Sequence, residues 1–166
     1  MASKEETPVP TKKLITQYGL DFNASTFDWN TVKSENLLYK CLDSNRCNPT
    51  SGAILAHAKE QVDNMQRHVG VGLCIFKIGV TANPLLRFAS YLDLGYTTMW
   101  LINVSPSLGL TVMLEAALIS EYGYSSGCKN KPNSGGEGAF NRSKPLKPPF
   151  FVYVVAGRAD QPRWVG

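Results

Sequence analysis

The chain has 166 residues, of which 43% are hydrophobic and 18% charged, and its formal net charge is +4. These values are ordinary for one soluble globular domain with a core of its own. No apolar run is long enough to cross a bilayer, and the polar N-terminus lacks the pattern of a secretory signal. We therefore expect an intracellular protein in a reducing compartment, and the composition does not separate nucleus from cytoplasm.

The four cysteines fit a reducing compartment. Cys41, Cys47, Cys74 and Cys128 form no CxxC pair and have no histidine at the spacing of a zinc site. Structural zinc and disulfide frameworks both need such regular spacing. We expect buried free thiols.

The positive charge is concentrated near the C-terminus. Residues 1–127 hold ten Lys/Arg and eleven Asp/Glu, a net of −1, whereas residues 128–166 hold seven and two, a net of +5. Such a cluster suits a polyanion, because each neutralised phosphate releases counterions. A solvated basic loop is the plain alternative. The residues that we assign to nucleic-acid binding are Lys129, Lys131, Arg142, Lys144 and Lys147.

The pattern of turn residues and apolar segments divides the chain into three parts. Residues 1–13 are expected to be a disordered tail, and residues 14–69 an N-terminal extension that is partly helical. Within this extension, apolar residues from Ile54 to Val69 recur at helical spacing and predict a helix near 52–68. Residues 70–166 then form the core domain.

The core domain alternates strands and helices. The predicted elements are strands near 73–80, 97–104 and 150–156 and helices near 84–94 and 111–122, with a basic Gly/Pro-rich loop at 124–149. Asn83 is a good N-cap for the first of these helices, and Pro84 suits its first position. Long loops in compact domains are often functional. We predict an α+β fold with a small three-stranded antiparallel sheet flanked by helices.

Three charged residues stand in apolar surroundings. Glu115 lies in a helix that we expect to be buried on most sides, where a carboxylate is costly unless it is paired or binds a metal. It either pairs with Arg87 or serves as a ligand for a hard divalent cation. Arg87 follows a strand and either covers apolar surface with its stem or holds a phosphate. Lys77 either points to solvent or, if half-buried, has a lowered pKa and accepts a proton.

The order of these residues matches a known pattern. A strand ending in Lys77-Ile78-Gly79 is followed by Thr81, a helix with Arg87 and Tyr91, a helix with Glu115, an asparagine within 128–133 and the glycine run 134–138. Over about residues 73–140 this order resembles the GIY-YIG nuclease family, and its phage-type members most.

The resemblance implies a GIY-YIG-like fold and a metal-dependent endonuclease. The substrate would be DNA, with RNA as an alternative, and the cofactor one divalent ion, Mg²⁺ or Mn²⁺, that stabilises charge on phosphorus and on the leaving oxygen. Matched to the family, Glu115 is the metal ligand and Arg87 contacts the scissile phosphate. Asn130 is the asparagine that organises the site, with Asn133 as the alternative.

The sequence departs from the family pattern at two points. Lys77 replaces the tyrosine of the YIG motif, and no GIY strand lies immediately upstream. Tyr39, within residues 37–41, or Tyr153, within residues 151–155, would fill the missing position. We favour Tyr153, which makes the domain a circularly permuted member whose last strand takes the place of the first.

The attacking water needs a base. We hypothesise that Tyr153 and Lys77 flank this water, although a tyrosine with an ordinary pKa near 10 is a poor base at neutral pH. A hydroxide bound to the metal is the alternative. Two other functions are open: a catalytically inactive nucleic-acid-binding module on the same fold, and a basic interaction domain in which Arg87 and Glu115 form a structural pair.

Overall fold

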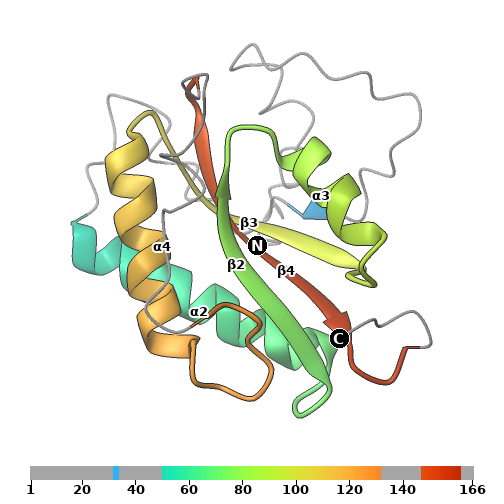
Figure 1. The fold of residues 1–166 in the computed structure, drawn as a ribbon. Helices are drawn as coiled ribbons and strands as arrows, with labels where there is room; N and C mark the ends of the chain where they lie inside the picture. The colour runs from blue at the N-terminus through green and yellow to red at the C-terminus, as the bar shows by residue number, and fades with distance from the viewer. Residues whose placement is uncertain (1–31, 34–49, 132–146, 162–166) are drawn as a thin grey trace, which may run out of the picture.

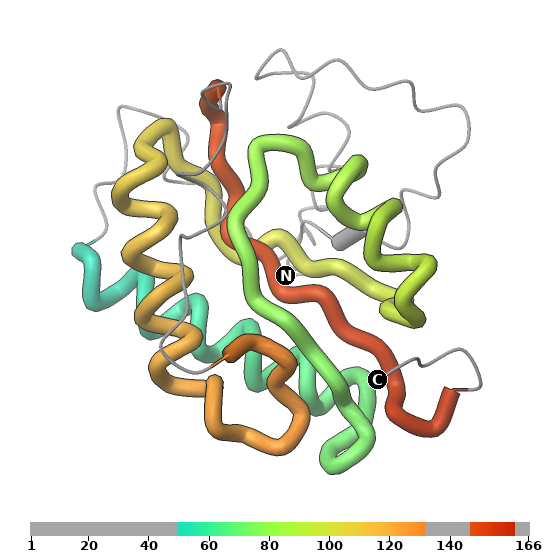
Figure 2. Tube along the Cα trace, viewed as in Figure 1, coloured from blue at the N-terminus to red at the C-terminus, as the bar shows by residue number. Residues whose placement is uncertain are grey.

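The computed structural model describes residues 32–33, 50–131 and 147–161 (Figures 1 and 2). Its elements in chain order are β1 (Val32–Lys33), α2 (Ser51–Val69), β2 (Cys74–Thr81), α3 (Pro84–Leu92), β3 (Thr98–Ser105), α4 (Leu108–Tyr122) and β4 (Phe150–Arg158). The three helices and three long strands confirm the predicted α+β fold.

The sheet has the strand order β1-β3-β4-β2. The last strand, β4, therefore lies in the middle and pairs antiparallel with both β2 and β3. The two-residue β1, which was not predicted, adds a parallel pair to β3. Because β4 has neighbours on both edges and helices over the sheet, its residues from Phe150 to Gly157 are buried.

Side-chain caps set the helix starts. The Asn83 side chain accepts a hydrogen bond from the Leu86 N–H at 3.0 Å, and Pro84 takes the first position of α3, as predicted. The Ser107 hydroxyl accepts from the Leu110 N–H at 3.3 Å. This cap explains why α4 begins a few residues earlier than the apolar pattern indicated.

The helices cover the sheet in two layers, with α2 and α4 on one face and α3 on the other (Figure 1). Alternate strand residues form the core under α2 and α4, among them Phe76 and Ile78 of β2 and Val152 and Val154 of β4. Successive residues of a strand point to opposite faces, so Lys77, Gly79 and Tyr153 face α3. Helix α2, placed with the N-terminal extension from the sequence, packs into the same core.

Helix α4 is less enclosed than expected. The expectation of burial on most sides is wrong, because Leu110 and Met113 are 60% and 68% exposed. The helix lies on the sheet along one face only, with Leu114, Leu118 and Ile119 inward, and its other apolar side chains point away from the core. None of the described helices combines the length and apolar character needed to cross a membrane.

Candidate active site

A pair of buried tyrosines lies between β4 and α3. The hydroxyl oxygens of Tyr153 and Tyr91 are 3.0 Å apart and share a hydrogen bond. Their ring centroids are 6.0 Å apart, and Tyr91 also meets Tyr96 edge to face at 5.2 Å. Only 2% of Tyr153 is exposed. Burial of both hydroxyls is tolerated because each satisfies the other.

The position of Tyr153 depends on its neighbours in the sheet. Tyr153 is paired in register with Gly79 of β2, and a β-carbon at Gly79 would overlap the Tyr153 hydroxyl and ring. Glycine is therefore required sterically at this position. On the other side, the pairing with β3 shifts between Leu101 and Asn103, next to Tyr153. Such bulges are frequent beside active sites, where they redirect side chains.

The environment of Tyr153 changes its acidity. Burial raises the pKa of the hydroxyl well above its ordinary value, and the neighbouring Tyr91 raises it further through its charge and its hydrogen bond. The Arg87 guanidinium lowers this pKa, and the Glu115 carboxylate raises it. Tyr153 is therefore neutral near pH 7, with a cation and an anion close enough to act on it.

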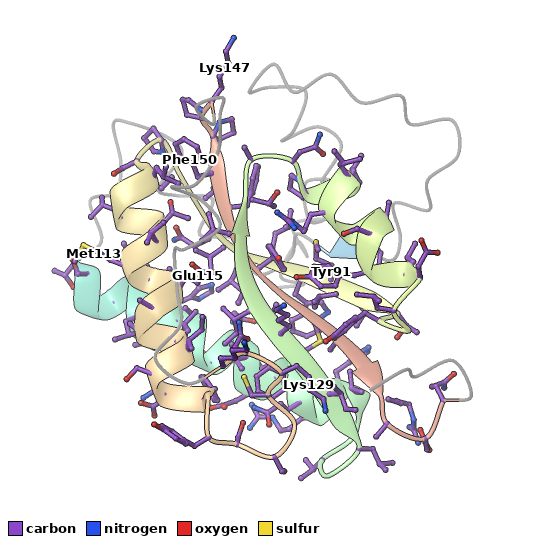
Figure 3. All side chains as sticks on the ribbon, in the orientation of Figure 1. Tyr91, Met113, Glu115, Lys129, Lys147 and Phe150 are labelled. Carbon is purple, nitrogen blue, oxygen red and sulfur yellow. The ribbon has the colours of Figure 1, made fainter. Side chains whose placement is uncertain are left out.

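The two charged residues that affect the pKa of Tyr153 belong to different helices. Arg87 is half-buried in the first turn of α3, and its backbone N–H donates to Asn83 O at 3.1 Å. Glu115 belongs to α4 and is only 9% exposed, which confirms the burial expected for this carboxylate. In Figure 3, Glu115 and Tyr91 lie on either side of β2. The charges of residues 87 and 115, which are far from Tyr153 in sequence, thus affect its pKa from opposite sides of β2.

Lys77 lies on the same face of the sheet as Tyr153. It is half-buried and is paired with Val155, two residues along β4 from Tyr153. Residues in this diagonal relation have Cα atoms about 7–8 Å apart, a distance that a long side chain can span. Lys77 therefore lies within side-chain reach of Tyr153 on this face of the sheet.

Asn130 is bonded to the backbone of β2. Its Oδ1 accepts from the Ile78 N–H at 2.7 Å, and its Nδ2 donates to the Ile78 carbonyl at 2.8 Å. Residues 124–131, called here the edge segment, run beside β2, with Phe76 N donating to Gly127 O and Lys129 N donating to Phe76 O. The Asn130 side-chain amide thus makes the hydrogen bonds that a peptide unit of a neighbouring strand would make. It makes them to Ile78, which lies one residue from both Lys77 and Gly79.

The structure describes some of the other predicted site residues, and the rest lie outside the described ranges. Lys129, Lys131 and Lys147 are exposed, the first two on the edge segment and the third just before β4. Arg142, Lys144, Asn133 and Tyr39 lie outside the residues that the structure describes, as do Cys41 and Cys47. Cys74 is a buried free thiol, and burial raises its pKa to about 11.

Glu115 is a hard oxygen donor of the kind that Mg²⁺ prefers. Over residues 50–131 and 147–161 no three acidic, histidine or cysteine side chains gather in one place. Mg²⁺ does not need such a cluster, because it keeps several waters and is commonly held by one or two carboxylates together with substrate phosphates. A single buried carboxylate therefore fits this ion.

The sequence interpretation assigned no role to Tyr91 or Tyr96. Tyr91 follows Arg87 by four residues, so both lie on one face of α3, which was a usable signal. Tyr96 follows the end of α3 and is brought under it by the turn at Gly95. Burial raises the pKa of Tyr96 to about 12, with smaller contributions from Tyr91 and Cys128.

Comparison with protein-family models, with curated proteins and with solved structures found no match to this chain. The function proposed below therefore depends on the residues and their geometry, together with the resemblance of the ordered motif.

Proposed function

We propose that this chain is a metal-dependent endonuclease that hydrolyses phosphodiester bonds in DNA. The observation that carries the proposal is the buried Tyr153 hydroxyl, bonded to Tyr91 and close enough to Arg87 of α3 and Glu115 of α4 for both charges to affect its pKa. An ordered motif alone can arise by chance, but here charges from two helices act on one buried hydroxyl of a central strand. Strongly perturbed titratable groups beside opposite charges are typical of functional sites.

The proposed roles follow from charge and position. Arg87 binds a non-bridging oxygen of the scissile phosphate and stabilises the charge that develops on it. Glu115 holds the divalent ion, which when bound supplies charge stabilisation at phosphorus and at the leaving oxygen. Lys77, on the same face as Tyr153, orients the attacking water and in its unprotonated form accepts the proton of that water.

The state of Tyr153 refines its proposed role. Because burial keeps this hydroxyl neutral near pH 7, Tyr153 cannot be a phenolate base. When Tyr91 is the donor in the hydrogen bond between the two hydroxyls, the Tyr153 O–H can donate to the attacking water or to a phosphate oxygen. Asn130 acts indirectly, by holding the backbone of β2 between Lys77 and Gly79.

The proposal is tested by cleavage of supercoiled plasmid in Mg²⁺, in Mn²⁺ and in EDTA. Wild type is compared with Glu115→Gln and with the matched control Glu121→Gln, an exposed carboxylate on the same helix that pairs with Lys59 at 2.8 Å. We expect metal-dependent nicking that Glu115→Gln abolishes and Glu121→Gln retains. Equal nicking by Glu115→Gln and wild type would contradict the proposed role of Glu115.

Burial of the tyrosine pair favours a second candidate, a catalytically inactive nucleic-acid-binding module on the same fold. Tyr153 and Tyr91 are almost inaccessible, whereas hydrolysis requires water beside the reacting phosphate. This candidate predicts that wild type binds DNA at low salt without cleaving it in either metal. Such a result, together with unchanged binding by Glu115→Gln, would replace the nuclease proposal.

A further inference from the structure

The edge segment combines an exposed aromatic ring with two exposed lysines. Tyr124 is 77% exposed, although the buried Tyr122 at the end of α4 lies only two residues before it. Lys129 and Lys131 are also exposed, and residues 124–131 contain no acidic side chain. Figure 3 shows Lys129 beside β2. An aromatic ring next to positive charge is the combination that binds unpaired nucleotides, because bases stack on the ring and phosphates meet the lysines.

The edge segment is held by the fold at several points. The Ser125 N–H donates to Tyr122 O at 2.9 Å, and the Cys128 N–H donates to Ser125 O at 3.1 Å. A β-carbon at Gly127 would overlap the Cys74 carbonyl, so the backbone lies directly against β2. The exposed ring of Tyr124 is therefore presented from a fixed backbone, which reduces the entropy lost on binding.

Further exposed apolar side chains lie at the same end of the molecule. Val71 and Leu73 are exposed in the turn that leads into β2, and Cys74, the first residue of β2, contacts Gly127 of the edge segment. Tyr124 is thus not a single exposed ring on a polar surface. Apolar contact area next to positive charge fits the base and the phosphate of an unpaired nucleotide better than it fits a paired duplex, whose bases are hidden.

We propose that the edge segment is a binding platform for single-stranded nucleic acid, on which a base stacks on Tyr124 and backbone phosphates contact Lys129 and Lys131. This inference deepens the proposed function and rests on it, because it takes nucleic acid as the partner. The edge segment runs beside β2 from Phe76 toward Gly79, a distance of about 10 Å at the usual rise of a strand. A strand bound there leads toward Tyr153 and Arg87, so the preferred substrate has an unpaired region beside the cleaved bond.

The test is the affinity of the full chain for fluorescein-labelled oligonucleotides, measured by anisotropy in EDTA so that nothing is cleaved. The probes are a single strand, a blunt duplex and a duplex with a single-stranded tail. Tyr124→Ala is expected to weaken binding of the single strand and of the tailed duplex by about five- to hundredfold, and to leave the blunt duplex unchanged. Lys129→Gln and Lys131→Gln are each expected to lower the salt slope on the single strand by about 0.7.

Two control variants separate stacking from general loss of surface. Tyr124→Phe keeps the ring and is expected to bind within about twofold of wild type. Met113→Ala removes another exposed apolar side chain, on α4, and is expected to change nothing. Unchanged single-strand binding by Tyr124→Ala, an equal loss on the blunt duplex, or failure of Tyr124→Phe to restore binding would each overturn the inference.

Failure of this inference is distinguishable from failure of the proposed function. If wild type binds the single strand through Tyr124 but cleaves no substrate in Mg²⁺ or Mn²⁺, the platform stands and the nuclease proposal falls. If wild type cleaves DNA and Tyr124→Ala binds every probe as wild type does, the platform falls and the nuclease proposal stands. Absence of binding by wild type to all three probes would also overturn the platform.

Discussion

The two faces of the sheet use alternate residues of the same strands in different ways. Toward α2 and α4, strands β2 and β4 present apolar side chains such as Phe76, Ile78 and Val154, all essentially without exposure. One step along the chain, toward α3, the same strands present Gly79 and Tyr153. Arg87 and Tyr91 then meet Tyr153 from α3.

This difference teaches which face the fold needs for stability and which it keeps for another purpose. The strand side chains under α2 and α4 are apolar and stabilise the domain by their burial. On the α3 face, the buried hydroxyls of Tyr153 and Tyr91 add little stability that apolar side chains of equal size would not provide. Such polar groups are costly to bury and cluster at sites of binding or catalysis.

The largest expected effect is on the apolar face. Phe76→Ala is expected to lower the free energy of unfolding by about 3–5 kcal/mol, because it removes a fully buried ring and leaves a cavity. Urea denaturation measures this loss, and Leu86→Ala, at an exposed position on α3, should stay within about 0.5 kcal/mol of wild type. A decrease in the free energy of unfolding of less than about 1 kcal/mol for Phe76→Ala would contradict the assignment of this face as the core.

The next effect is catalytic and belongs to the α3 face. Arg87→Ala is expected to lower kcat for plasmid cleavage by about 10²–10³, because it removes the cation proposed to stabilise the transition state. Its free energy of unfolding should change little, since Arg87 is only half-buried. Arg67→Ala, an exposed arginine on α2, is the control. Equal kcat for Arg87→Ala and wild type would remove Arg87 from the site.

A substitution at Gly79 tests how tightly this face is assembled. Gly79→Ala is expected to cost about 1–3 kcal/mol of stability and to move the Tyr153 ring, since the added methyl overlaps it. Gly109→Ala, in the first turn of α4, has room for a methyl group and should be neutral or slightly stabilising. Equal stability of the two variants in urea would show that Tyr153 is held less rigidly than the contact implies.

The smallest effect concerns alkaline pH. The pKa of Tyr153 is higher in the folded than in the unfolded chain, so its contribution to stability is complete below the unfolded pKa of about 10 and is lost as pH rises above it. The urea midpoint of wild type should therefore fall between about pH 9.5 and about pH 11, and Tyr153→Phe should show a smaller fall. Parallel curves for the two proteins would contradict burial of the Tyr153 hydroxyl.

The sequence was sufficient for local features of the fold. Capping by Asn83, the helical spacing of apolar residues and the strand character of residues 150–156 predicted the main elements within a few residues, because each depends on nearby side chains. The bulge after Leu101 and the two-residue β1 were missed, because they depend on pairing between distant segments. The exposed side of α4 was missed because an apolar helix has no polar face to mark it.

Only part of the candidate site could be predicted from the sequence. Arg87 and Glu115 stood out as charges in apolar surroundings, and Tyr153 through the resemblance. The overlap of Gly79 with Tyr153 and the use of Asn130 to bond Ile78 depend on strand register, which no local pattern reports. The exposure of Tyr124 likewise depends on the conformation of the turn after α4, which decides the position of the ring.

The central claim is that the Tyr153 hydroxyl serves chemistry whereas the part-buried Tyr122 hydroxyl on the other face serves the fold. The direct test compares Tyr153→Phe with Tyr122→Phe, whose hydroxyl donates to Asp63 at 2.8 Å and to Lys59 O at 3.0 Å between α2 and α4. Single-turnover cleavage in Mg²⁺ is measured for both variants. The folded fraction of each variant is determined from its urea denaturation curve. We predict that both lose about 1–2 kcal/mol of stability but that only Tyr153→Phe slows cleavage, by about a hundredfold or more. Equal cleavage rates per folded molecule for the two variants would contradict the claim.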